Sequence, residues 1–452
     1  MTPSAAALAI IIGVMPNATS GAAPVRPAPP TAGALAERPS IAPEQWDAEI
    51  DELVAILEHR HVDPFAVTSR EEFRTAADGL KQRLPGLTSE QVLIEIAKLT
   101  ALLGDPGTSA ALDQFRLRFR TLPVRLAFIE EGVVVSFATS EHADLLGAEV
   151  IAIGDVPIAQ LAKDLLAVVA VDNRWGARQR LANLAHFVEL LAANGAAPAE
   201  GPVSITAMPR GAPRSERDGA DAGDAPAAGA PVTVELIPLP PRVAPELRSI
   251  VDLTPRDRQP ISWRTGRGNF WFERIPDREA ILFKYDRCID NPGAPFARTA
   301  ADAIAEMKEM AEPRIVIDLR QNGGGDSRII EPLIAALESD ERFRRPGSVV
   351  VLIGPRTQGS GAMNALSLRA RAGALLVGEP TGQRPNHLGE MRTANLPNTG
   401  LVVSYSTRRF RQVEGDPEAV MPDEVVLLKI EDVLGGRDAA LERALDPALV
   451  PG

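Results

Sequence analysis

The chain contains 452 residues, which is enough for two or three domains with buried cores. Its formal net charge of −12 argues against nucleic acid or an anionic membrane surface as a main partner. The single cysteine, Cys288, excludes an internal disulfide, and no Cys/His cluster has the spacing of metal ligands. We therefore expect no metal and no other cofactor.

The first forty residues differ from the rest of the chain. Residues 6–15 form an apolar run that is too short to span a bilayer, and ATSGA follows it as a candidate cleavage zone. The positive start of a signal peptide is missing, because the first basic residue is Arg26. Residues 1–40 therefore read as the signal peptide and linker of a periplasmic or secreted protein, or as a disordered extension of a cytoplasmic one.

Residues 41–119 are predicted to form a helical domain. An apolar stripe of helical period begins at Trp46, and a second runs through 92–103. Thr88-Ser-Glu-Gln opens the second stripe as a capping signal.

Residues 120–245 are predicted to form a mixed β/α domain. LPVRLAFIEEGVVVSFAT indicates two strands around a Glu-Glu-Gly turn. A further hairpin, a helical stretch and two strands follow at 148–158, 159–193, 203–207 and 232–237. The insertion at 208–231 is rich in proline, glycine and charge, so we expect a mobile surface loop there.

Residues 246–452 are predicted to form an α/β core. Strands alternating with helices indicate βαβ units and a largely parallel sheet. The expected strands are 270–272, 280–285, 314–319, 349–353, 374–377 and 401–406, and the expected helices are 299–310, 328–337 and 361–371. Ligands of such sheets bind at the carboxyl ends of the strands, where the loops after Leu319 and Ile353 lie.

The first of these loops is glycine-rich and reads IVIDLRQNGGGDS at 315–327. Glycines let backbone N–H groups face inward, where they bind an anion or stabilise the oxyanion of a tetrahedral intermediate. Asp326 stands where a phosphate-binding loop needs a lysine, which excludes that interpretation. A tight turn that closes a βαβ unit is the simpler alternative. Asp318 and Arg320 are expected to pair with each other or to brace the loop.

The second loop reads GPRTQGSGAMN at 354–364 and places Ser360 between two glycines. Nucleophilic serines stand at such strand-to-helix turns, and so do ordinary helix caps. The residues alone leave both interpretations open.

Three segments in fixed order resemble the tail-specific (C-terminal-processing) serine peptidase family: IVIDLRQNGGG, LIGPRTQGSGAMN and ALLVGEPTG. The likeness begins at WDAEIDELVAILEHRHVDPF, continues through LLGAEVIAIGDVPI and ends at GRDAALERAL, so it covers residues 42–445. The resemblance implies a crotonase-like α/β core at 246–452, a PDZ-like region at 120–245 and an N-terminal helical cap at 41–119.

The resemblance also implies a site built from the two loops. Ser360 is the candidate nucleophile, and the oxyanion or binding loop would comprise Gly323, Gly324, Gly325 and Gly361. Many family members place the nucleophile two residues after a threonine, where this chain has Gly359. Aligning Met363-Asn364 with the family's Met-Asn favours Ser360 instead, so the assignment stays open.

Both familiar bases of the family are replaced. Arg384 stands at the position of a lysine, and a guanidinium cannot accept the proton of a serine. Gly107 stands at the position of a histidine in Gly-Asp-x-His-Thr, and Gly107→His would restore a base only if the loop presents it within about 3 Å of the serine. His387 is the remaining candidate base, with a structural hydrogen bond in a loop as the alternative. His61 is expected to cap or pack.

Two late carboxylates, Asp416 and Glu418, lie where related enzymes keep an acid that orients the histidine. Without such a histidine they are expected to be solvated loop residues. The sequence therefore leaves two hypotheses: a serine peptidase with impaired catalysis, and an inactive pseudopeptidase that binds peptide or protein C-termini by strand addition.

Overall fold

The computed structural model describes residues 41–209, 230–264, 267–276 and 278–449. The expected signal peptide and linker at 1–40 lie outside the described residues, as does most of the insertion at 208–231. None of the helices in the described ranges is long and apolar enough to cross a membrane.

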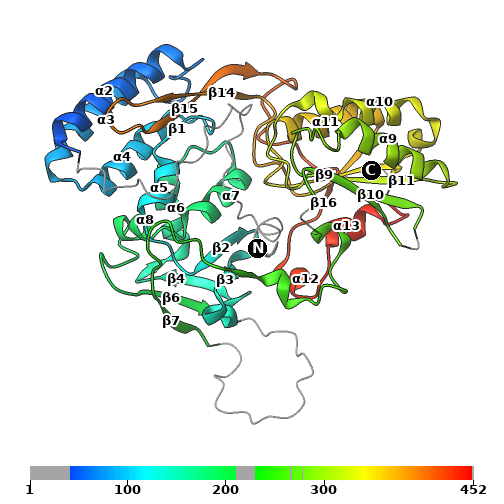
Figure 1. The fold of residues 1–452 in the computed structure, drawn as a ribbon, viewed down its shortest axis with the longest axis horizontal. Helices are drawn as coiled ribbons and strands as arrows, with labels where there is room; N and C mark the ends of the chain where they lie inside the picture. The colour runs from blue at the N-terminus through cyan, green and yellow to red at the C-terminus, as the bar shows by residue number, and fades with distance from the viewer. Residues whose placement is uncertain (1–40, 210–229, 265–266, 277, 450–452) are drawn as a thin grey trace, which may run out of the picture.

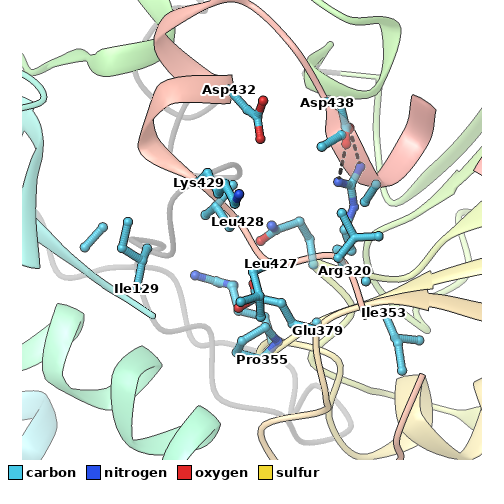
Figure 2. Close-up of a pocket in the computed structure, with 18 of the residues that line it drawn as sticks. Ile129, Arg320, Ile353, Pro355, Glu379, Leu427, Leu428, Lys429, Asp432 and Asp438 are labelled. Atoms are coloured by element: carbon cyan, nitrogen blue, oxygen red, sulfur yellow. Dashed lines mark hydrogen bonds and ion pairs between the residues drawn. The ribbon is translucent and has the colours of Figure 1, made fainter. Parts of the chain in front are cut away.

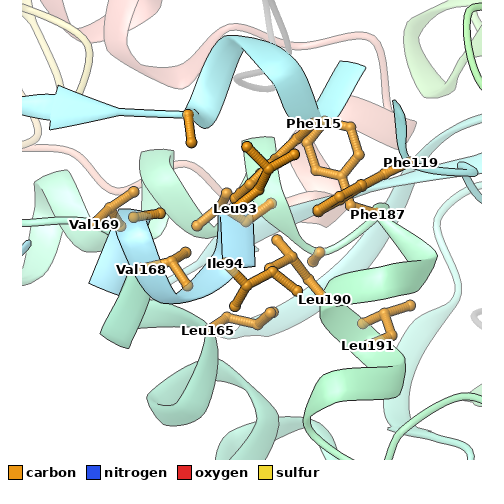
Figure 3. Packing of buried hydrophobic residues seen from close by; sticks show 14 of the residues in the cluster. Leu93, Ile94, Phe115, Phe119, Leu165, Val168, Val169, Phe187, Leu190 and Leu191 are labelled. Atoms are coloured by element: carbon orange, nitrogen blue, oxygen red, sulfur yellow. The ribbon is translucent and has the colours of Figure 1, made fainter. Parts of the chain in front are cut away.

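The N-terminal region is helical, as its apolar stripes predict. Thr88 caps α4 in a reciprocal pair of hydrogen bonds with Gln91, which confirms the capping signal. Figure 3 shows Leu93 of α4 packed near the stacked rings of Phe115 and Phe119, whose centroids are 4.4 Å apart. The helices are α2 (Pro43–Arg60), α3 (Arg70–Arg83), α4 (Ser89–Ala101) and α5 (Leu112–Arg118).

The second region is built on an antiparallel sheet of order β2-β3-β4-β6-β7, to which the short strands β5 and β8 add. The predicted Glu-Glu-Gly turn joins β2 to β3, and β2 is an edge strand that packs beside α7. The strands are β2 (Val124–Ile129), β3 (Gly132–Ala138), β4 (Glu149–Ile153), β5 (Val156–Pro157), β6 (Val203–Met208), β7 (Val232–Leu236) and β8 (Arg248–Ser249). The helices are α6 (Ile158–Leu165), α7 (Arg174–Leu184) and α8 (Val188–Ala193).

The third region is a six-stranded sheet of order β16-β13-β12-β11-β10-β9, in which every neighbouring pair is parallel except β9 with β10. This arrangement confirms the expected βαβ core, seen at the right of Figure 1. The expected core strand at 401–406 is the exception, because it belongs to β15, outside this sheet. The strands are β9 (Phe270–Arg274), β10 (Ala280–Tyr285), β11 (Arg314–Asp318), β12 (Val349–Ile353), β13 (Leu375–Gly378) and β16 (Glu424–Val425).

Helices cover both faces of this sheet because successive side chains of a buried strand point to opposite faces. Ile315 and Ile317 of β11 pack under α9 (Phe296–Lys308), α10 (Glu331–Ser339) and α11 (Ser360–Ala372). Val316 packs on the other face with the short helix α13 (Ala439–Ala444), which follows α12 (Ile430–Leu434).

A long hairpin of β14 (His387–Asn395) and β15 (Val402–Phe410) leaves the core and pairs with β1 (Ser109–Ala110). Figure 1 shows it lying along the N-terminal helices. Glu49 of α2 accepts hydrogen bonds from Asn398 and Thr399 at its tip. The sequence analysis had placed His387 in a loop, which was wrong. β14 shows no apolar alternation, so its pairing with β15, and not its own pattern, makes it a strand.

Candidate functional site

The two loops singled out from the sequence meet at the carboxyl ends of β11 and β12. The Gln358 N–H donates to the Asn322 carbonyl at 2.9 Å. The Gly324 backbone lies so close to the serine turn that a Cβ on it would be 3.2 Å from the Ser360 nitrogen. The expectation that these loops converge at one end of a single sheet is therefore confirmed.

The glycine loop needs glycine for its shape. Gly324 and Gly325 have φ values of +108° and +135°, which side chains rarely tolerate. A Cβ on Gly325 would lie 2.1 Å from the Cys288 carbonyl oxygen. Asn322, which is fully buried, braces the loop by donating to the Tyr285 carbonyl and accepting from the Gly324 N–H.

The expected oxyanion donors do not all remain available. The Gly324 N–H donates to Asn322 Oδ1 at 3.0 Å, and the Gly361 N–H donates to the Gln358 carbonyl at 2.9 Å. Among the hydrogen bonds of the described residues, none engages the N–H groups of Gly323 or Gly325. Of the four glycines expected to bind an oxyanion, these two are the ones whose N–H groups remain open.

Ser360 is the first residue of α11 and its hydroxyl faces the glycine loop. Ser360 Oγ donates to the Gly325 carbonyl at 2.6 Å. Gly359 takes the N-cap position with φ +50° and ψ −126°, a conformation that suits glycine. Gly359 has no side chain to present, so the hydroxyl at this turn is that of Ser360.

His387 does not lie with Ser360. Its Nδ1 is 3.1 Å from the carbonyl oxygens of Arg384 and Pro385, and its ring stacks on Phe410 with centroids 5.3 Å apart. Burial lowers the pKa of His387 below its ordinary value. No described contact joins His387 to Ser360, and the imidazole is held as a structural residue at the start of β14.

Arg384 and the late carboxylates also point elsewhere. Arg384 Nη1 pairs with Asp416 at 3.0 Å, and its Nε donates to the Asp172 carbonyl. Glu418 is exposed, and its backbone carbonyl accepts from Asn173. These groups fasten a loop of the core to the start of α7, and none of them is in contact with Ser360 among the described interactions.

Gln383 is the residue beside the serine turn that the sequence analysis missed. Its Oε1 accepts from the Gly359 N–H at 2.6 Å, and its carbonyl accepts from the Thr381 hydroxyl. The sequence offered one signal for Gln383: it stands one residue before Arg384, in the segment where the family that the chain resembles keeps a lysine. Gln383 is neutral, so it fixes the turn and supplies no base.

His61 was expected to cap or pack, and it does both: it is the C-cap residue of α2 and is buried, with its imidazole hydrogen-bonded to Asp105. His61 Nε2 donates to Asp105 Oδ2 at 3.0 Å, and His61 Nδ1 accepts from the Asp63 N–H, which defines the tautomer. The two side chains are 0% and 1% exposed. Burial alone would raise the pKa of Asp105, but hydrogen bonds from His61 and Thr108 lower it below its ordinary value.

Gly107 lies against this pair and leaves no room for a larger residue. Its N–H donates to Asp105 Oδ1 at 3.0 Å. A Cβ on Gly107 would lie 2.6 Å from Ser406 Oγ and 3.3 Å from Asp105 Oδ1. Gly107→His would therefore require the Ser406 side chain to move, and no described contact joins Gly107 to Ser360, so the condition for restoring a base is not met by the backbone as it stands.

Asp318 and Arg320 pair with each other, as expected from the sequence. Arg320 Nη2 lies 2.8 Å from Asp318 and 2.7 Å from Asp438, the N-cap residue of α13. Lys284 Nζ lies 2.8 Å from Asp318. Burial alone would raise the pKa of Asp318, but Arg320 and Lys284 hold it far below its ordinary value. This network fixes α13 to the sheet beneath the glycine loop.

Among the described residues, no group of three or more His, Cys, Asp or Glu side chains could hold a metal ion. Cys288 is buried beneath the glycine loop, and burial raises the pKa of its thiol to about 11. The thiol is therefore protonated at neutral pH and is not a nucleophile.

No family model and no curated protein sequence matches the chain. Solved structures do match its fold. The chain is similar to mature CPAF complexed with lactacystin at a TM-score of 0.57 and 12% identity, over 87% of this chain and 96% of that one. A point mutant of CPAF matches at a TM-score of 0.57 and 12% identity, over 91% and 99% of the two chains.

The photosystem II D1 C-terminal processing protease matches more distantly, at a TM-score of 0.39 and 15% identity over 87% and 98% of the two chains. At these identities the likeness concerns the fold alone. The expected fold class, a crotonase-like α/β core with a β/α region and an N-terminal helical cap, is confirmed. The chain thus has the fold of CPAF.

Proposed function

We propose that this protein is a pseudopeptidase, which binds extended peptide or protein C-termini on a tail-specific peptidase fold without turning them over. One observation carries the proposal: Ser360 Oγ donates to a backbone carbonyl, and no imidazole, amine or carboxylate among the described residues contacts it. A serine hydroxyl without a base is a poor nucleophile at neutral pH.

Among the described residues around Ser360, no general base contacts the hydroxyl to take its proton. A carbonyl oxygen such as that of Gly325 is not a base of useful strength. Arg384 stays protonated and faces Asp416, while Gln383 is neutral. General bases contribute about 10²–10⁴-fold in rate, so their absence removes most of the turnover expected from the fold.

The binding role is supported by the edge strand β2 (Val124–Ile129). It pairs with β3 on one side only and packs beside α7. Val124–Ala127 are buried, and the last two residues of the strand, Phe128 and Ile129, are partly exposed next to that helix. Strand addition at such an edge holds an extended peptide through its main chain, as PDZ domains do. This PDZ-like role of the region at 120–245 is part of the proposal.

The experiment combines a serine-directed fluorophosphonate probe with a peptide-binding assay. We expect no labelling of the unmodified protein and saturable binding of peptides with free C-termini. Ser360→Ala should bind peptides as the unmodified protein does, and Ser367→Ala on the same helix is the matched control. Absence of both labelling and peptide binding would reject the proposal.

The second candidate function is that of a serine peptidase acting through Ser360. The strand–turn–helix placement of Ser360 facing the glycine loop favours it. Labelling of the unmodified protein that disappears in Ser360→Ala, together with cleavage of an unstructured peptide, would establish this alternative.

We further propose that the protein is exported to the periplasm or the medium, on the strength of the apolar segment at 6–15. Fractionation of cells expressing the full chain tests this, and recovery of the intact chain only in the cytoplasm would contradict it.

A further inference from the structure

A cavity of about 130 Å³ lies between the β/α region and the core sheet. On the core side it is lined by residues that follow β11, β12, β13 and β16, all at the carboxyl ends of parallel strands. Figure 2 shows Pro355 and Glu379 there, facing Leu427 and Leu428 of the C-terminal segment, with Ile129 of β2 on the opposite wall. Ser360 and the candidate oxyanion glycines, Gly323, Gly324, Gly325 and Gly361, do not line this cavity.

Most charged groups around the cavity already have partners. Arg320 is paired with Asp318 and Asp438, and Figure 2 shows the hydrogen bonds to Asp438. Lys284 is paired with Asp318. Arg178 Nη1 lies 3.8 Å from Glu379 Oε1. These groups therefore shape the walls and do not require an added ion.

Arg356 is different, because its guanidinium lacks an acceptor. Its Nε and Nη1 atoms are buried without a hydrogen-bond partner among the described residues, and the nearby Asp286 carboxylate, whose charge acts on Arg356, forms no ion pair with it there. Arg178 Nη1 is likewise buried without a hydrogen bond. Burial lowers the pKa of Arg356 only to about 10, so it stays charged at neutral pH. An anion bound in the cavity would add to the charge of Asp286 the hydrogen-bond acceptors that the guanidinium lacks.

We propose that this cavity binds a carboxylate carried on an apolar group of about one ring, with Arg356 as the receptor of the anion. A guanidinium presents paired donors that match a carboxylate. Ile129, Leu427 and Leu428 supply apolar wall for the rest of the ligand. The size follows from the volume, because an engineered protein cavity of about 150 Å³ binds benzene.

A carboxylate on an apolar group of this size could come from two kinds of ligand. It is found in a free aromatic or branched carboxylic acid, and in the last residue of a peptide lying along β2, whose end contributes Ile129 to the cavity wall. The site itself does not rest on the function proposed above, since a free acid would bind whether or not the protein binds peptides.

Calorimetric titration of the full chain with phenylacetate tests the site. Acetate, which has the carboxylate without the ring, and benzyl alcohol, which has the ring without the carboxylate, are the controls. We expect saturable binding of phenylacetate, at least tenfold tighter than either control. Arg356→Gln should weaken phenylacetate at least tenfold, whereas Arg344→Gln, an exposed arginine on the core, should leave it unchanged. Equal binding of benzyl alcohol and phenylacetate, or unchanged affinity in Arg356→Gln, would overturn the proposal.

A second variant keeps the test decisive if Arg356→Gln fails to fold. Ile129→Trp enlarges a side chain on the opposite wall and should abolish phenylacetate binding, while retained binding would overturn the site. Competition then identifies the source. An acetylated peptide ending in phenylalanine that displaces phenylacetate, while its amide does not, assigns the site to peptide C-termini. Phenylacetate binding without competition assigns it to free acids.

Discussion

Ser360 lies at the carboxyl end of the parallel sheet, whereas the His61–Asp105 pair lies under the N-terminal helices beside β15. The serine donates to a backbone carbonyl and has no titratable partner among the described residues. The imidazole and the carboxylate bind each other, backbone N–H groups and the hydroxyl of Thr108, which donates to Asp105. The serine hydroxyl and the imidazole–carboxylate pair are thus held in different parts of the same chain.

The comparison shows that side chains of catalytic type do not form a catalytic site unless the fold brings them into contact. The His61–Asp105 pair is completely buried, so its hydrogen bonds hold the helical cap together. Ser360 is only partly buried and contributes one hydrogen bond. Removing His61 or Asp105 should therefore lower the stability of the protein clearly, whereas removing the Ser360 hydroxyl should change it very little.

The largest expected effect follows from removing the imidazole. His61→Ala leaves the buried Asp105 carboxylate without its main donor, and breaking a buried pair in this way costs about 3 kcal/mol or more. Urea unfolding of the two proteins measures the difference. His59→Ala, an exposed histidine two residues away, is the matched control and should change little. A loss below about 0.5 kcal/mol in His61→Ala, no larger than a typical surface substitution, would show that the pair is not structural.

A second test supplies the missing base at the serine. Gln383 contacts the N–H of Gly359, so Gln383→Lys brings an amine to the turn that carries Ser360. We expect fluorophosphonate labelling of Ser360 to accelerate by about 100-fold, the lower end of general-base effects. Gln383→Met has a similar length without an amine and should give no gain. Equal labelling of both variants would mean that the amine does not reach the hydroxyl.

The pH dependence of stability distinguishes the two regions further. The pKa of Asp105 is lowered in the fold, so its contribution is present above the ordinary aspartate pKa of about 4 and is lost as pH falls through the folded value. The stability difference between the unmodified protein and Asp105→Asn should therefore shrink below about pH 4. Urea midpoints between pH 3 and 7 measure it, and a constant difference would contradict this account.

The smallest expected effect is that of Ser360→Ala. Losing one partly exposed hydrogen bond should cost about 1 kcal/mol or less. Binding of a peptide with a free C-terminus should stay unchanged, because the hydroxyl is already used within the protein. A marked loss of peptide affinity would place Ser360 in the binding surface and bring the two regions closer in role.

Much of the fold could be predicted from local patterns. The capping signal at Thr88, the Glu-Glu-Gly hairpin and the strand–loop–helix series of the core all appear where their residues indicate. The hairpin of β14 and β15 could not be predicted in this way, because β14 has polar and apolar residues without alternation and is held by its pairing with β15. Its position on the helical cap also depends on contacts such as Glu49 with Thr399, which are 350 residues apart.

The candidate site was predicted in part. The convergence of the two glycine-bearing loops follows from their place after parallel strands. The role of Gln383 could not be predicted from the sequence, because its contact with Gly359 depends on how the chain turns after β13. The same holds for Arg356, which reads in sequence as an ordinary loop residue and is unpartnered only because the core packs against the β/α region.

The sequence by itself determined the elements, their order and the glycine conformations of the two loops, because these depend on residue type and near neighbours. Tertiary structure decided which groups meet: that Ser360 faces a carbonyl, that His61 is buried with Asp105, and that a cavity beside Arg356 remains open. The physical reason is that hydrogen-bond and charge partners are set by distances of about 3 Å between segments far apart in the chain, which local propensities do not encode.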